Sequence, residues 1–295
     1  MMRIIIFLLL INLNSLGQTK KSIYIYEQDS KSPVQFATIL FFESENKQNG
    51  VYSDENGLAQ IKLGQNSFME ISCIGYENKR VLYNNELKDT IYLKPNVVVL
   101  NEVIVSNRKA VRYFGFENQK TSNSLNTFKG NEILVYIKNT YSTEAKIKSV
   151  LLHIEKRKDF KVALKIKFYK KNIDDKPADL LNTQEIIYYI TKRKKGVLEI
   201  DINNFNIDFP KEGAFVGVEC LGFVDKNGNF IYNNNLWNDF RFLLVDNEEN
   251  LTFVRNNLKS NIWYNNLKFR LEEVGERFEN YPNVAFGINV YTDEK

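Results

Sequence analysis

Histidine and cysteine are scarce in this chain of 295 residues, which holds one histidine and two cysteines. Zinc sites use clustered Cys and His ligands, and a relay that activates a serine or cysteine nucleophile needs a histidine as its base. The one histidine, His153, lies in the segment LLHIEK, where alternation places it opposite Leu152 and Ile154 and predicts a surface position. We therefore expect no metal ion, no cofactor and no relay catalysis.

Long apolar runs are also lacking. The run Ile4–Ile11 has eight apolar residues, far fewer than the ~20 that a membrane-spanning helix needs. It follows Arg3 and precedes small and polar residues, which is the order of a secretory signal peptide. We predict a signal peptide over 1–17 with cleavage before Gln18, no transmembrane span in the mature chain, and export to the periplasm or the outer-membrane surface.

The two cysteines, Cys73 and Cys220, lie far apart in the sequence, in the apolar runs MEISCIGY and FVGVECLGF. We interpret both first as small buried apolar residues. An exported protein can also form disulfides, and sequence alone does not show whether the geometry of these two residues permits one. A Cys73–Cys220 bond therefore stays open at this point.

The net charge of +4 is too small to argue for nucleic acid as a partner. Its distribution is uneven, because residues 129–199 hold 17 Lys and Arg against 9 Asp and Glu, while residues 200–295 hold 9 against 15. We prefer the interpretation that opposite charges on successive strands of one domain meet and cancel. The alternative is that the asymmetry orients the protein against an anionic surface or a partner.

Short alternating runs dominate the chain, and helical periodicity is nearly absent. Between Ile23 and Leu93 such runs are bounded by turn-forming residues, which is typical of a β-sandwich. Alternation resumes after a polar, aperiodic stretch and predicts a second antiparallel sandwich, jelly-roll-like, over 129–295. Two segments differ: Pro177–Leu181 suits one helical turn, and Leu267–Phe278 fits either a helix or a strand.

Two acidic Asn-Gly segments, Asp54–Gly57 and Asp225–Gly228, look like calcium loops. An EF-hand loop with Gly57 at its sixth position would have Tyr52 first and Leu63 twelfth, and neither supplies the acidic ligand required. The second segment fails in the same way. Because Asn and Gly both tolerate positive φ, we predict tight corners between strands, with Asn-Gly as a hairpin signal.

Four motifs succeed one another between Ile23 and Val105. They are Pro33–Ile39 (PVQFATI), Tyr52–Gly57 (YSDENG), Ile71–Glu77 (ISCIGYE), and Thr90–Leu93 (TIYL) with Leu100–Val105 (LNEVIV) after it. The series resembles the carboxypeptidase-like regulatory domain, a transthyretin-like β-sandwich common in exported proteins of Bacteroidetes. The resemblance implies a non-catalytic module, which in that family often precedes TonB-dependent transporters or accompanies metallocarboxypeptidases. The residues after Val105 suit neither companion.

Aromatic residues in Asn-rich stretches are the one candidate for a ligand site. Tyr232 and Trp237 lie in YNNNLWND, and Trp263 and Tyr264 lie in NIWYNN. Rings beside amides suit a sugar-binding loop, because they combine an apolar platform with hydrogen bonds. The same residues also pack ordinary sandwich cores.

The predicted organisation is a signal peptide at 1–17, the regulatory-type module at 18–105, a linker at 106–128 and the second sandwich at 129–295. We predict a non-catalytic exported interaction or scaffolding protein of the bacterial cell envelope, with another envelope protein as its partner. The alternative is a glycan-binding module that uses the four aromatic residues. An enzyme with a carboxylate pair ranks third.

Overall fold

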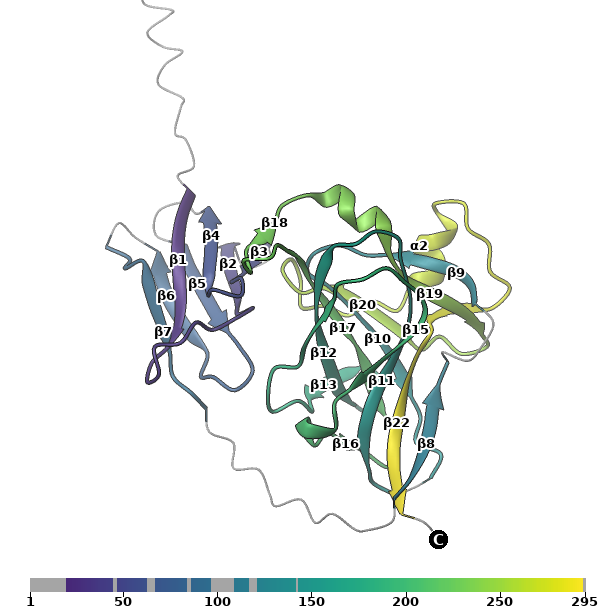
Figure 1. The fold of residues 1–295 in the computed structure, drawn as a ribbon. Helices are drawn as coiled ribbons and strands as arrows, with labels where there is room; N and C mark the ends of the chain where they lie inside the picture. The colour runs from purple at the N-terminus through teal and green to yellow at the C-terminus, as the bar shows by residue number, and fades with distance from the viewer. Residues whose placement is uncertain are drawn as a thin grey trace, which may run out of the picture.

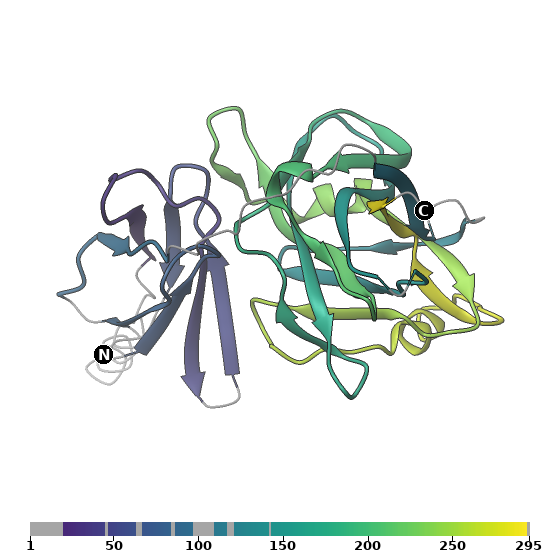
Figure 2. The same ribbon diagram turned by 90° about the horizontal axis from the view of Figure 1, so that it is seen from below.

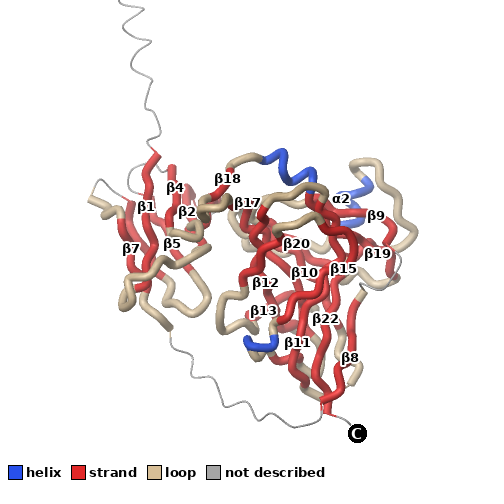
Figure 3. The backbone as a smooth tube through the Cα atoms, viewed as in Figure 1, coloured by secondary structure: helices blue, strands red, loops and turns tan. Residues whose placement is uncertain are grey.

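The computed structural model describes seven stretches of the chain, and almost all of their regular elements are strands (Figure 3). The strands form two bodies that lie side by side, a small N-terminal module and a larger second domain (Figure 1). The predicted signal peptide lies outside the described residues. Among the described residues, no helix has the length and apolar character needed to cross a membrane. The described stretches are 20–44, 47–62, 67–83, 86–96, 109–116, 121–141 and 143–293.

The N-terminal module is a sandwich of two small sheets. Its strands are β1 (Lys20–Glu27), β2 (Thr38–Ser44), β3 (Lys47–Tyr52), β4 (Leu58–Lys62), β5 (Ser67–Ser72), β6 (Lys79–Tyr83) and β7 (Thr90–Leu93). One sheet has the order β4-β1-β7 and the other β3-β2-β5-β6. The pairs are antiparallel except for β1 and β7, which run parallel. Alternate residues such as Ile23, Ile39 and Ile71 are fully buried between the sheets, as the sequence pattern predicted.

The second domain is a larger sandwich of two antiparallel sheets, seen from a second direction in Figure 2. The first sheet contains β10 (Asn131–Ile137), β12 (Lys161–Lys171), β13 (Pro177–Leu180), β14 (Ile187–Ile190), β17 (Ala214–Val224), β18 (Phe230–Ile231) and β20 (Thr252–Asn256). Its central order is β13-β12-β17-β10-β20, with β14 beside β12 and β18 beside β17.

The other sheet of the second domain has eight strands. They are β8 (Lys109–Gly115), β9 (Thr121–Asn126), β11 (Ala145–Lys156), β15 (Lys194–Asp201), β16 (Asp208–Phe209), β19 (Phe240–Asn247), β21 (Tyr281–Val284) and β22 (Phe286–Asp293). The central order is β21-β19-β11-β22-β8. Short helices η2 (Asn203–Phe205), η3 (Asn234–Asp239) and α2 (Leu267–Glu272) lie in the connections. Val216, Phe242 and Ile288 are among the fully buried residues of the main core between the two sheets.

The prediction of an all-β protein with two sandwiches is confirmed. The second sandwich has sheets of seven and eight strands, so it is larger than an ~8-stranded jelly roll. The prediction of a helical turn at Pro177–Leu181 is wrong, because Pro177–Leu180 forms the edge strand β13. An edge tolerates a residue that has no N–H to donate. The ambiguous segment Leu267–Phe278 contains a helix over Leu267–Glu272.

The predicted linker at 106–128 is wrong for two of its segments. Lys109–Gly115 is strand β8 and pairs with β22, and Thr121–Asn126 is strand β9 and pairs with β19. Phe114 is buried in the main core. The polar sequence TSNSLN concealed β9, since an edge strand needs backbone hydrogen bonds more than apolar side chains.

The two Asn-Gly segments are turns. The Asp54 carboxylate accepts backbone N–H groups from two residues of its turn at 2.9 Å each, and Asp225 does the same at 2.8 and 2.9 Å. Gly57 and Gly228 have φ of 74° and 86°, which glycine adopts without strain. The first turn joins strands of different sheets, so the predicted corner is confirmed and the hairpin is wrong there. The second joins β17 to β18 as a hairpin.

Candidate functional site

The module and the second domain share a buried apolar cluster. Phe36 and Tyr52 of the module are 0% and 1% exposed. The Phe36 ring packs against the rings of Tyr189 and Phe230, with centroids 6.2 and 5.8 Å away. Its φ of 53° lies in the left-handed region, which a bulky residue keeps only where its surroundings hold it. Further buried members of the shared cluster are Ala163, Leu221, Val224 and Leu258.

The surface that receives the module is the outer face of β12 and β17. Along β12, Val162 and Leu164 point into the main core, so Lys165 and Lys167 lie on the opposite face. Simple alternation predicts both lysines in solvent. They are only 2% and 7% exposed. The face that the sequence pattern assigns to water is therefore a second interior.

A row of charged residues crosses this interior, one from each of four neighbouring strands. The strand register pairs them in turn across β12, β17, β10 and β20. Two carboxylates stand directly opposite each other in the row, an arrangement that is unfavourable when both are charged. The row is Lys165, Glu219, Glu132 and Arg255.

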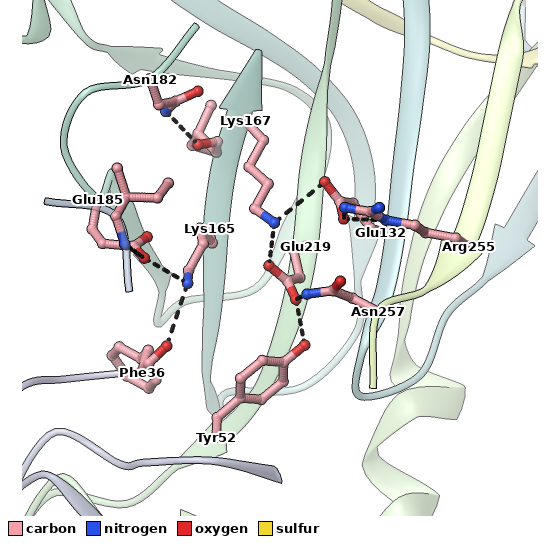
Figure 4. A network of polar contacts seen from close by, with 12 residues as sticks. Phe36, Tyr52, Glu132, Lys165, Lys167, Asn182, Glu185, Glu219, Arg255 and Asn257 are labelled. Atoms are coloured by element: carbon pink, nitrogen blue, oxygen red, sulfur yellow. Dashed lines mark hydrogen bonds and ion pairs between the residues drawn. The ribbon is translucent and has the colours of Figure 1, made fainter. Parts of the chain in front are cut away.

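Lys167 relieves the repulsion between the two carboxylates. Its Nζ lies 2.8 Å from Glu219 Oε2 and 3.4 Å from Glu132 Oε1, as Figure 4 shows. Both glutamates have 0% exposed side chains. A buried charge without a partner costs several kcal/mol, so this lysine and the two glutamates depend on one another.

The module contributes directly to this network through Tyr52. The Tyr52 hydroxyl donates to Glu219 Oε1, and the Asn257 side-chain amide donates to the same oxygen at 2.7 Å. Glu219 therefore has the module on one side and its own domain on the other (Figure 4). A hydrogen bond to a charged acceptor is worth about 1.5–3 kcal/mol. The contact between the two domains is therefore coupled to the hydrogen bonding of the Glu219 carboxylate.

Arg255 ends the row beside Glu132. Its Nη2 and Nε lie 2.7 and 2.8 Å from Glu132 Oε2. The Tyr169 hydroxyl donates to Glu132 Oε1 at 2.5 Å. The Trp263 ring lies 4.1 Å from the Arg255 guanidinium, a cation–π arrangement.

Lys165 forms the second polar contact between the two domains. Its Nζ lies 2.8 Å from Glu185 Oε1 and donates to the Phe36 carbonyl of the module at 3.3 Å. The same glutamate oxygen accepts the Ile74 backbone N–H at 3.0 Å and the Cys73 thiol at 3.4 Å. Glu185 thus belongs to the second domain in sequence and binds the module.

The titration of the network is set by burial and pairing. Burial acts to raise the pKa of Glu219, but Lys167 and Lys165 outweigh it and lower the pKa to about 2. Burial acts to lower the pKa of Lys167, yet Glu132 and Glu219 raise it well above its ordinary value. Burial and the nearby Glu219 raise the pKa of Tyr52. These groups therefore keep their charge states at neutral pH.

The two Asn-Gly turns extend the junction at the surface. The Asn56 side chain donates to the Asn227 carbonyl at 3.1 Å, and the Glu55 backbone N–H donates to the Gly228 carbonyl at 3.2 Å. Lys161 forms an ion pair with Glu55 at 2.5 Å. The segments that resemble calcium loops therefore hold the two domains together.

The chemistry open to the network is limited by its pairing. A general acid or base works best with a pKa near the working pH, and a glycosidase pair needs one carboxylate with a raised pKa. Glu219 has a strongly lowered pKa, and Glu132 is paired with two cations. The arrangement suits fixing the two domains in one orientation better than transferring protons.

The four predicted aromatic site residues do not converge. Trp237 is 3% exposed in the main core, with its ring centroid 4.3 Å from that of Phe223, so its ring is not open to a sugar in this structure. Trp263 packs on Tyr169 at 5.8 Å. Tyr232 lines a cavity of about 460 Å³ beside β3 and β4, and Tyr264 lines a different one of about 680 Å³.

The remaining sequence predictions concern single residues. His153 lies opposite the buried Leu152 and Ile154 as alternation predicted, although it is half-buried. Cys73 and Cys220 are buried and not bonded to each other, so the open disulfide alternative does not occur. Burial raises the pKa of the Cys220 thiol to about 12. In the described part of the chain, no three His, Cys, Asp or Glu side chains gather in a way that could hold a metal ion.

Three ion pairs agree with the preferred interpretation of the charge asymmetry, and two of them, Lys167–Glu219 and Lys146–Asp208, join neighbouring strands. Each joins a lysine of 129–199 to an acidic residue of 200–295. Lys167 pairs with Glu219 at 2.8 Å, and Lys158 pairs with Asp239 at 2.8 Å. The third pair is Lys146 with Asp208.

The junction residues were missed by sequence reasoning, although one signal was present. Glu219 stands alone in the apolar strand AFVGVECLGFV, and such a strand does not accept a carboxylate without a partner. In comparisons with known proteins, no family model matches the chain and no curated protein matches it. The function is therefore inferred from the junction and the cavities.

Proposed function

We propose that the protein is an exported, non-catalytic interaction protein of the bacterial cell envelope, in which the module and the second domain act as one rigid unit. The observation that carries this proposal is the pairing of Glu219 with Lys167 of its own domain and with Tyr52 of the module. The resemblance of the module to the carboxypeptidase-like regulatory domain, and the signal-peptide pattern at 1–17, support export.

Rigidity is the useful property of such a unit. A partner that contacts both domains loses less conformational entropy when their orientation is already set. Buried polar groups accept few alternative geometries, since each donor and acceptor must find its partner again. A single docking geometry is what a scaffold for another envelope protein requires.

Partner capture and then direct binding test the proposal. The purified chain is immobilised, envelope proteins that it retains are identified by mass spectrometry, and the dissociation constant is measured with the purified partner. We expect Phe36→Ala to weaken this binding about tenfold, because it removes the ring that the second domain receives. The matched control is Glu248→Gln, an exposed residue away from the junction, which we expect to leave the dissociation constant unchanged.

Three outcomes would contradict the proposal. One is that no envelope protein binds the purified chain directly. Another is that Phe36→Ala binds the partner as tightly as the original protein while its melting transition shows a loosened junction. The third is turnover of a substrate that survives purification. Recovery of the chain from the cytoplasm would overturn the export part alone.

For the alternative of glycan binding, only the exposed aromatic residues remain candidates for contact with a sugar. Tyr232 and Tyr264 are 70% and 39% exposed. The cavity beside Tyr264 supplies further polar groups, which lead to a separate inference.

A further inference from the structure

A second cavity lies in the second domain, where β9, β20 and α2 approach one another. Its volume is about 680 Å³, within the range of small-molecule sites. Buried residues of the main core, Ile133, Val254 and Leu267, form its apolar side. Amides from several Asn side chains and the ring of Tyr264 also line it.

The charges around this cavity are of one sign. Its lining contains four cationic residues and neither aspartate nor glutamate. Two of the cations have other roles: Arg255 is paired with Glu132 at 2.7 Å, and the Lys129 ammonium lies 3.7 Å from the centroid of the Phe230 ring. The other two, Lys259 and Arg270, are exposed and form no ion pair with any described residue.

Amide side chains give the cavity hydrogen-bonding groups. They belong to Asn126, Asn131, Asn234 and Asn256. The Asn256 side chain donates to Asn131 Oδ1 at 3.0 Å and to the Lys129 carbonyl at 3.3 Å. The lining therefore offers amide groups to the hydroxyls of a ligand.

The three features select one class of ligand. Free cations call for an anionic group, and the amide side chains of the lining call for polar groups such as hydroxyls. The Tyr264 ring, 5.6 Å from the Arg270 guanidinium, offers a flat apolar platform beside the charges. A sugar that carries a carboxylate has all three complements: the anion, hydroxyl donors and an apolar ring face.

We propose that this cavity binds an acidic saccharide. Its carboxylate is held by Lys259 and Arg270, its hydroxyls form hydrogen bonds with asparagine amides of the lining, and one ring face lies on Tyr264. This inference goes beyond the interaction role proposed above and does not depend on it, because the cavity lies within the second domain.

Calorimetric titration of the purified full chain tests this site. The probes are trigalacturonate, trimannuronate from alginate, and a hyaluronan tetrasaccharide, each at low and raised salt. We expect saturable binding of at least one probe, weakened by salt because the attraction involves charge. For trigalacturonate, the methyl-esterified form is the matched neutral probe. If trigalacturonate binds, we expect its neutral form to bind at least about tenfold more weakly.

Variants connect the binding to this cavity. We expect the double variant Lys259→Gln and Arg270→Gln to weaken binding at least about tenfold, and Tyr264→Ala to weaken it about fivefold. The matched control is Lys192→Gln, an exposed cation outside the cavity, with no expected change. Melting temperatures show whether each variant is folded.

Several results would overturn the proposal. They are absence of saturable binding across all three probes, equal binding of charged and esterified trigalacturonate, and an unchanged affinity in the folded double variant. A loss of binding in Lys192→Gln equal to that in the double variant would also overturn it, because it would indicate a diffuse charge effect. Failure here leaves the proposed binding of a partner by the rigid two-domain unit unaffected, so the two proposals are tested separately.

Discussion

The main core of the second domain and its junction with the module are both buried, but the junction adds a network of paired charges to its apolar cluster. In the core, apolar residues such as Val216, Phe242 and Ile288 are fully buried. At the junction, Lys167 and Glu219 are 7% and 0% exposed. Both sets come from the same kind of strand, on alternate faces. The apolar face of a strand is therefore not the only face that is buried, because a neighbouring element can also cover the polar face.

The difference has an energetic consequence. The apolar core tolerates the exchange of one apolar side chain for another of similar size, because the hydrophobic effect has no direction. The junction depends on named partners, because a buried charge is stable only when it is paired and hydrogen-bonded. We therefore expect the core to set how stable the domain is, and the junction to set how the two domains are oriented.

The largest expected effect comes from Glu219→Gln, which keeps the side-chain shape and removes the charge. Lys167 would then face Glu132 alone, and breaking a buried pair costs about 3–5 kcal/mol. Urea unfolding monitored by tryptophan fluorescence measures the change. A loss below about 1 kcal/mol would show that the pair behaves like an exposed one.

A double variant separates the effect of the unpaired Lys167 charge from the effect of the altered side chain at position 219. Lys167→Met combined with Glu219→Gln removes both partners, so no unpaired charge between them remains. We expect the pair of changes to recover more than about 1 kcal/mol relative to Glu219→Gln alone. Simple additivity of the two single losses would contradict the proposed pairing.

Acid should weaken the junction before it weakens the core. The pKa of Glu219 is lowered from 4.5 to about 2 in the folded chain, so its contribution is complete above pH 4.5 and is lost as the pH falls towards 2. The shift corresponds to about 3 kcal/mol. Unfolding free energies measured at several pH values check this expectation. Glu219→Gln should show a correspondingly smaller acid dependence; an unchanged dependence would assign the effect to other groups.

Tyr52→Phe should have a moderate effect. It removes one hydroxyl from the buried Glu219 while the ring stays in the shared cluster. Loss of a hydrogen bond to a charged acceptor predicts about 1.5–3 kcal/mol, measured by urea unfolding. The matched control is Tyr24→Phe, because Tyr24 is 38% exposed and should change stability by less than about 0.5 kcal/mol. Equal effects at both positions would refute the role of Tyr52.

The smallest expected effect is that of Lys161→Gln at the edge of the junction. The Lys161 and Glu55 side chains are 27% and 20% exposed, so solvent screens their ion pair more than the pairs inside. We expect a loss of less than about 1 kcal/mol, measured by thermal unfolding at low and raised salt. A loss equal to that of Glu219→Gln would mean that the edge, and not the interior, holds the domains.

The fold was predictable because alternation is local. Val162 and Leu164 indicate a strand with one apolar face, and the turns at Gly57 and Gly228 are specified by their own residues. The strand β9 was not predictable in this way, since polar residues can pair through their backbone at a sheet edge. Aromatic composition likewise could not separate Trp237 in the core from the exposed Tyr264.

The candidate site was less predictable than the fold. Lys167 and Glu219 were visible as charges in two apolar strands, but their environment depends on the module. Tyr52 and Glu219 are 167 positions apart, and no local pattern states that they meet. The cavity near Asn256 and Arg270 also requires segments that only folding brings together.

The sequence by itself determined an all-β chain, the apolar faces of its alternating strands, the position of its two Asn-Gly turns, and the scarcity of histidine and cysteine ligands. These features arise from side-chain periodicity and composition, which act within a few residues. Only the tertiary structure decided that the outer face of β12 is an interior, that opposite charges of distant strands pair there, and that Trp237 is core. The physical reason is that burial and the strength of a charge depend on what packs against a residue, and that neighbour is distant in the chain.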